Sequence, residues 1–182
     1  MKKITRTVFI VSLVCLLAVV YSFRDEESFA PNLTGAWYLK QANEEATISF
    51  VDNYCVFTSY NQQSKKFNYT WGGPYKLTDK NIVVQVEFNT QQRELVGASF
   101  SFDYSMKGDK LVADFEKKKA EWTQVDNGKA ALAGVWRISG RKQGEVINEM
   151  PLGARRTLKI LTGKRFQWAA INIYTKEFFG TG

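Results

Sequence analysis

The chain has 182 residues, no histidine, two cysteines and a formal net charge of +7. The absence of histidine excludes Ser-His-Asp and Cys-His hydrolases, histidine acid–base catalysis and zinc sites that need imidazole. Basic and acidic residues are interspersed along most of the chain, which disfavours nucleic-acid binding, because that activity needs basic residues gathered on one face.

Residues 1–22 have the pattern of a secretory signal peptide. Lys2, Lys3 and Arg6 precede an uncharged, mostly apolar stretch over 8–20, which is short for a membrane span. We therefore expect a secreted or periplasmic protein with no membrane span after cleavage. Loss of the three basic residues would leave a mature net charge of about +4, a mild excess.

The cleavage site is predicted after Ser22. Cleavage after Ala30 is disfavoured, since Pro31 would follow the cut bond. Two further alternatives are an uncleaved anchor helix and a lipid anchor on Cys15, which lies inside the apolar run and lacks a small residue before it.

The region from residue 31 to residue 126 has the pattern of short β-strands. Apolar and polar residues alternate over 84–88 and 98–104, which is typical of strands with one buried face. Eight such strands without a convincing helix predict an all-β fold, a small antiparallel barrel; an open sandwich is the alternative. The predicted strands are 34–40, 45–51, 54–60, 67–77, 81–88, 97–105, 110–116 and 120–125.

Residues 130–182 look like a partial second copy of this domain. The segment Gly35-Ala36-Trp37 is matched by the segment Gly134-Val135-Trp136. The junction at 126–129 between the two copies is short, so we expect it to hold them in a fixed pairing. An insertion at 142–151 would account for an offset that grows by about ten residues. Three or four strands cannot close a barrel, so we expect a truncated copy with an edge prone to association. Either the natural chain continues past Gly182, or the partial copy packs against the first barrel or against another chain. The other matched segments are 47–50 with 157–160 and 65–70 with 176–181.

No catalytic or metal-binding group stands out. Cys55 is alone once the signal peptide is removed, and its strand-like setting predicts a small packed side chain. Asp103, Asp109 and Asp114 are close in sequence, but their pattern indicates a hairpin turn and outward strand positions rather than a glycosidase pair. We expect a non-enzymatic protein with no cofactor and no metal.

Both Gly-x-Trp openings resemble the first strand of lipocalins, in which the tryptophan plugs one end of the barrel. Residues 131–182, with Phe166-Gln167-Trp168 and Phe178-Phe179-Gly180, resemble secreted bacterial lipocalin-like domains of unknown function, and residues 32–126 do so more weakly. The resemblance implies a lipocalin-like barrel and export. It implies no particular ligand and no functional residues. On this basis Trp37 and Trp136 are both expected to be end plugs.

The barrel interior is the candidate site for a small apolar ligand. A filled interior is favoured over a cavity, because apolar residues at alternating strand positions are usually core. The candidate ligand-binding residues are Tyr69, Trp71, Val84, Val86, Phe100, Phe102 and Tyr104.

Two classes of function follow from these alternatives. A hollow barrel would indicate a carrier or sensor of a small apolar ligand in the cell envelope. A filled barrel with an apolar patch outside it would indicate a ligand-free module that binds a protein or glycan through aromatics such as Trp71, Tyr75 or Tyr174.

Overall fold

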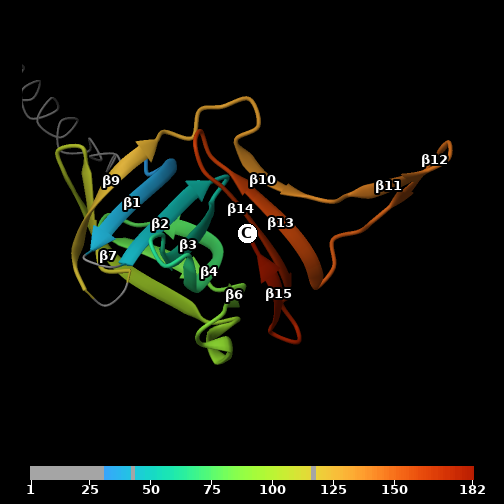
Figure 1. Ribbon diagram of the computed structural model, residues 1–182, viewed down its shortest axis with the longest axis horizontal. Helices are drawn as coiled ribbons and strands as arrows, with labels where there is room; N and C mark the ends of the chain where they lie inside the picture. Colours follow the sequence, from blue (N-terminus) through green and yellow to red (C-terminus); the bar gives the residue numbers. More distant parts are fainter. Residues whose placement is uncertain (1–30, 42–43, 116–117) are drawn as a thin grey trace, which may run out of the picture.

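The computed structural model describes residues 31–41, 44–115 and 118–182. The predicted signal peptide, the cleavage sites after Ser22 and Ala30, and the anchor site at Cys15 all lie outside the described residues. The described chain forms a closed barrel with a second antiparallel sheet beside it (Figure 1).

Eight strands of the described part of residues 31–126 form the barrel. They are all antiparallel, and the last strand closes the barrel by pairing with the first, with Ala36 opposite Asp126 and Tyr38 opposite Thr123. Closure leaves no open sheet edge, so the predicted barrel is confirmed and the sandwich is excluded. The barrel strands are β1 (Gly35–Gln41), β2 (Glu44–Val51), β3 (Tyr54–Asn61), β4 (Lys66–Leu77), β5 (Asn81–Gln85), β7 (Ser99–Lys107), β8 (Lys110–Ala113) and β9 (Ala120–Asp126).

The prediction of one continuous strand over 81–88 is wrong, because two separate strands, β5 and β6 (Phe88–Asn89), cover this region. The strand β5 pairs with β7 only as far as Gln85. The backbone then turns towards β4, and the Glu87 N–H donates to the Gly72 carbonyl at 2.9 Å. The two-residue strand β6 follows beside β4, and a short 3₁₀ helix, η1 (Arg93–Leu95), leads on to β7. The alternation of side chains continues across this change of partner, so the pattern alone does not reveal it.

A second sheet follows the barrel in the order β10-β13-β14-β15. Its strands are β10 (Gly134–Arg137), β13 (Arg155–Leu161), β14 (Phe166–Asn172) and β15 (Glu177–Thr181). Between its first two strands the chain makes a hairpin of β11 (Gly140–Gln143) and β12 (Val146–Glu149), which projects away from both sheets as an arm (Figure 1).

The second sheet repeats the first four strands of the barrel. The Trp37 indole N–H donates to the Leu33 carbonyl at 2.8 Å, and the Trp136 indole N–H donates to the Leu132 carbonyl at 3.0 Å. A β-bulge interrupts β3 and β4 after Ser59, and another interrupts β14 and β15 after Ala170. The sheet therefore fits a partial second copy of the barrel, as the sequence predicts.

The register of the strands corrects one detail of the repeat. Trp37 lies opposite Ile48, whereas Trp136 lies opposite Lys159, so residues 47–50 correspond to 158–161 rather than to 157–160. The match of 65–70 with 176–181 is consistent with the structure, since Lys65 and Lys176 both have positive φ, at 53° and 57°. The arm occupies the position of the predicted insertion.

The two sheets pack back to back. Outward-facing residues of the barrel, with Val51, Tyr54 and Val56 from β2 and β3, contact one face of the second sheet. That face contributes Leu158, Ile160, Ala169 and Ile171, all buried. In the repeat, this face of the second sheet corresponds to the outside of the barrel. The interior-equivalent face consequently points away from the barrel.

Polar contacts fix the pairing of the two sheets. The Asp126 carboxylate at the end of β9 accepts hydrogen bonds from the turn between β13 and β14. Gln167 accepts a bond from Thr58 at 2.7 Å and donates one to Thr70 at 3.0 Å. Arg156 pairs with Glu87, and both side chains are mostly buried. These contacts join the barrel, which precedes the 126–129 junction, to the second sheet, which follows it.

Candidate functional site

The interior of the barrel contains a stack of aromatic rings. Trp71 lies between Phe57 and Phe102, with ring centroids 5.2 Å away on each side and interplanar angles of 3° and 13°. Tyr69 extends the stack on the far side of Phe57 at 5.5 Å. Phe115 meets Phe102 edge-on at 5.3 Å. Such contacts fill the interior with packed side chains and resemble an ordinary protein core.

The structure brings five of the seven candidate ligand-binding residues together in this core. Trp71, Val84 and Tyr104 are buried in it, and Tyr69 and Phe102 pack against it. Among the described residues, Val86 is buried outside the cluster, just past the end of β5, and Phe100 is half-buried on β7. The Tyr104 hydroxyl donates to the Thr78 carbonyl at 3.0 Å. The contacts of these residues are those of packed core side chains.

The buried titratable groups of the barrel have pKa values that disfavour charge. Burial raises the pKa of Tyr75 to about 12 and raises the pKa of the Cys55 thiol strongly. Burial also raises the pKa of Tyr54, and its hydroxyl donates to Glu87 at 3.0 Å. A thiol that is hard to ionise is a poor nucleophile, in keeping with a packed role for Cys55.

The two tryptophans that were expected to be end plugs differ. Trp37 is 1% exposed and belongs to the core of the barrel. Trp136 is 50% exposed, so the expectation of a plug is wrong for this residue. The reason is that the four described strands of the second sheet do not close around it.

The outward face of the second sheet, here called the open face, presents a large apolar surface. Trp136, Lys159 and Trp168 form one row across β10, β13 and β14. The next row contains Leu161 and Phe166, and Phe166 is 54% exposed. The residues of the open face are Leu132, Trp136, Ile138, Lys159, Leu161, Phe166, Trp168 and Phe179.

Two adjoining pockets lie along the open face. The first, the apolar pocket, has a volume of about 360 Å³ and is lined mainly by Leu132, Trp136, Ile138 and Leu161. The second, the arginine pocket, has a volume of about 300 Å³ and contains several guanidinium groups. The two pockets share Arg137, Ile138 and Thr157, so they lie next to each other; together they are here called the groove.

The electrostatics of the groove are one-sided. No aspartate or glutamate is among the described residues that line either pocket. Arg156 is neutralised by Glu87, whereas the Arg155 guanidinium lies 4.5 Å from the centre of the Phe179 ring. The basic residues of the groove are Arg137, Arg141, Arg155, Arg156 and Lys159.

The repeat in the sequence contains a signal for the open face. Trp136, Leu161 and Trp168 occupy positions equivalent to the core residues Trp37, Phe50 and Phe57. In a copy with too few strands to close, such residues lose their cover. The three aromatic residues that were expected to bind a protein or glycan do not form one surface. Trp71 is buried and Tyr75 is half-buried, whereas Tyr174 is 82% exposed.

Comparisons with protein-family models, curated proteins and solved structures found no match. The closed antiparallel barrel is compatible with a lipocalin-like fold. Within the described residues, no helix has the length and apolar character needed to cross a membrane.

Proposed function

We propose that this chain is an exported, non-enzymatic binding protein of the lipocalin-like kind, in which the barrel is a scaffold and the open face is the binding surface. The signal-peptide pattern of residues 1–22 supports export to the periplasm or beyond. The Gly-x-Trp openings and the closed barrel support the kinship with secreted bacterial lipocalin-like domains.

The exposure of interior-equivalent residues carries the proposal. Leu33 and Trp37 are each 1% exposed, whereas their equivalents Leu132 and Trp136 are 63% and 50% exposed. Full burial of one large apolar side chain stabilises by about 1.5–3 kcal/mol, so a surface of this kind gains free energy from any apolar ligand that covers it. Large contiguous apolar patches that stay exposed often mark binding sites in soluble proteins.

The filled interior argues against the barrel as the binding site. Entry of a ligand would require the stack of Phe57, Trp71 and Phe102 to separate, with loss of its contacts. The apolar pocket on the open face needs no such rearrangement. The proposal therefore keeps the expected small apolar ligand and moves its site to the second sheet.

Titration with the neutral fluorescent probe N-phenyl-1-naphthylamine tests the proposal. We expect saturable binding that Trp136→Ala weakens by about five- to thirtyfold, because the ligand would cover the exposed half of the indole, worth about 1–2 kcal/mol. Tyr174→Ala removes another exposed aromatic and should leave binding unchanged.

A barrel variant distinguishes the two sites. Phe102→Leu would alter probe binding if the ligand entered the barrel, and should not if it binds the open face. The proposal fails if Phe102→Leu changes the probe affinity and Trp136→Ala does not. Thermal unfolding of each variant shows whether a loss of binding reflects a loss of folding.

The arm supports a second candidate function, the binding of a protein partner. Val146 and Ile147 are 62% and 66% exposed on a hairpin that projects from the molecule (Figure 1). An isolated two-stranded hairpin is marginally stable, so a partner that covers it would order it. A Val146→Ser, Ile147→Ser double variant should keep probe binding and lose co-purification with such a partner; unchanged co-purification would reject this candidate.

A further inference from the structure

We propose that the groove on the open face binds a small amphiphilic anion, a molecule with one apolar chain and a carboxylate or similar anionic head. The apolar pocket would hold the chain and the arginine pocket would hold the head. This inference rests on the proposed function, because it assigns a ligand class to the same surface.

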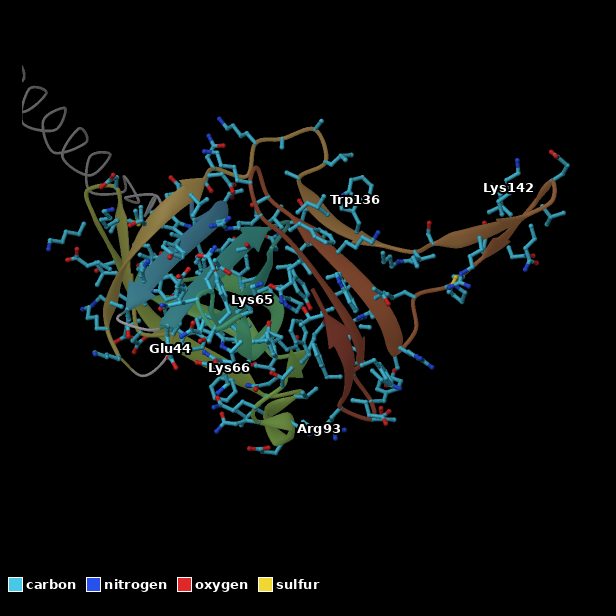
Figure 2. All side chains as sticks on the ribbon, in the orientation of Figure 1. Glu44, Lys65, Lys66, Arg93, Trp136 and Lys142 are labelled. Atoms are coloured by element: carbon cyan, nitrogen blue, oxygen red, sulfur yellow. The ribbon has the colours of Figure 1, made fainter. Side chains whose placement is uncertain are left out.

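The apolar pocket suits a single alkyl chain. Its volume of about 360 Å³ lies at the lower end of the range for small-molecule sites. The Trp136 ring is oriented by its bond to the Leu132 carbonyl, so it forms a pre-ordered wall at little entropic cost. Figure 2 shows Trp136 standing out from the second sheet near the base of the arm.

The arginine pocket suits the anionic head. The Arg137 guanidinium is held through one nitrogen by the carbonyls of Ile138 and Met150, at 3.2 and 3.0 Å. Both contacts use Nη1, and the remaining guanidinium donors of an arginine can match the two oxygens of a carboxylate in geometry. The ring of Phe179 positions Arg155 at the same pocket. In addition, the buried Arg156 Nε has no hydrogen-bond partner among the described residues.

The two pockets have lining residues in common, and this determines how the ligand would lie in the groove. Arg137, Ile138 and Thr157 belong to both pockets, so a chain in the apolar pocket places its head among the arginines without leaving the groove. A cationic head would meet Arg137, Arg141 and Arg155, which have no carboxylate partner among the lining residues, beside Arg156, which Glu87 neutralises. The charge of the groove therefore selects an anion over a cation of the same chain length.

Charge also argues against a second copy of the chain as the occupant. The second sheet has four described strands, so the sheets of two chains together have the eight strands of a closed barrel and could cover each other's apolar side chains. Lys159 lies between Trp136 and Trp168 in one row of the open face, so a closed pair would bury two lysines with no carboxylate from either face. Burial of unpaired charge is strongly unfavourable.

Calorimetric titration of the full mature chain with decanoate and with decyltrimethylammonium, both below their micellar concentrations, tests the proposal. We expect decanoate to bind at least tenfold more tightly than the cation. Octanoate should bind on the order of tenfold more weakly than decanoate, because each buried methylene contributes about a factor of four.

Two neighbouring charges provide a matched pair of variants. Arg141→Gln removes a lining residue of the arginine pocket and should weaken decanoate binding about three- to tenfold. Lys142→Gln removes the same charge from the next residue, which does not line either pocket, and should leave the affinity unchanged. Figure 2 shows Lys142 towards the far end of the arm.

Three outcomes overturn the inference. Equal affinity for decanoate and decyltrimethylammonium, with N-phenyl-1-naphthylamine still bound, rejects the anion and leaves the proposed function standing. Binding to anionic vesicles without binding of monomeric decanoate replaces the small ligand by a membrane surface. Absence of binding for all probes, together with a dimer in sedimentation, rejects both the inference and the proposed function in favour of a second copy.

Discussion

Replacement of Asp126 by alanine should loosen the second sheet from the barrel while leaving the barrel folded. The carboxylate accepts bonds from Thr162 Oγ1 at 2.8 Å and from the N–H groups of Gly163 and Lys164 at 2.9 Å each. A fourth bond, from the Gly128 N–H at 2.9 Å, shapes the junction. Three of the four bonds thus join β9 to the turn between β13 and β14.

The magnitude follows from these bonds. A hydrogen bond to a charged group contributes about 1.5–3 kcal/mol, and the partial exposure of Asp126 and the coupling of its bonds make their sum less than additive. We expect Asp126→Ala to reduce the free energy of opening the second sheet by about 2–4 kcal/mol. Asp126→Asn keeps the size, loses the charge and should have a smaller effect.

Acid should produce the same loosening. Burial tends to raise the pKa of Asp126, but its bonds with Gly128, Gly163, Thr162 and Lys164 outweigh burial and hold the pKa below its ordinary value. A lowered folded-state pKa stabilises the fold above the unfolded-state pKa of about 4. This stabilisation is lost as the pH falls below about 4 and through the folded-state value.

Hydrogen exchange followed by mass spectrometry measures the effect region by region. In Asp126→Ala, amides of β13 and β14 should exchange about thirtyfold faster or more, and amides of β2 and β3 should be nearly unchanged. Unchanged exchange in β13 and β14, or an equal increase in both sheets, would refute the role given to Asp126. At pH 3 the natural chain should approach the exchange pattern of the variant.

Three further changes test the barrel. Phe57→Ala should lower the free energy of unfolding by about 3–5 kcal/mol in urea titration, against about 1 kcal/mol for the exposed Phe179→Ala; similar losses would contradict the filled interior. Gly35→Ala should cost more than Gly108→Ala, because both have positive φ but only at Gly35 would a Cβ approach a backbone oxygen, at 2.0 Å. Burial raises the pKa of Tyr75 to about 12, so the neutral phenol stabilises the fold fully below pH 10 and less as the pH rises towards 12. Urea titration at pH 9 and at pH 11.5 should show a lower free energy of unfolding at the higher pH. Equal free energies of unfolding at the two pH values would reject this role of Tyr75.

The barrel could be predicted from sequence because its signals are local. Alternation over 98–104 and the Gly-Asp turn at 108–109 fix strands and hairpins between neighbours in the chain. The end of β5 could not be predicted in this way. It depends on the Glu87 N–H reaching Gly72, a contact with β4 that the alternation does not encode.

The open face could not be predicted because it depends on how the second sheet packs against the barrel. The sequence shows that 131–182 repeats the start of the barrel, but both faces of that sheet carry apolar residues. Packing of Leu158 and Ile160 against the barrel decides which face is covered. Trp136 is then left on the other face, and a residue that would plug a closed barrel becomes part of a surface.

The back-to-back contact also sets an order of folding. The barrel buries its own interior and is synthesised first, so it can form before the second sheet emerges. The second sheet has one covered face, and the cover is the outer wall of β2 and β3. We therefore expect the barrel to serve as the template on which residues 134–181 fold, and a mutation that delays barrel closure should leave both sheets exposed to aggregation at once.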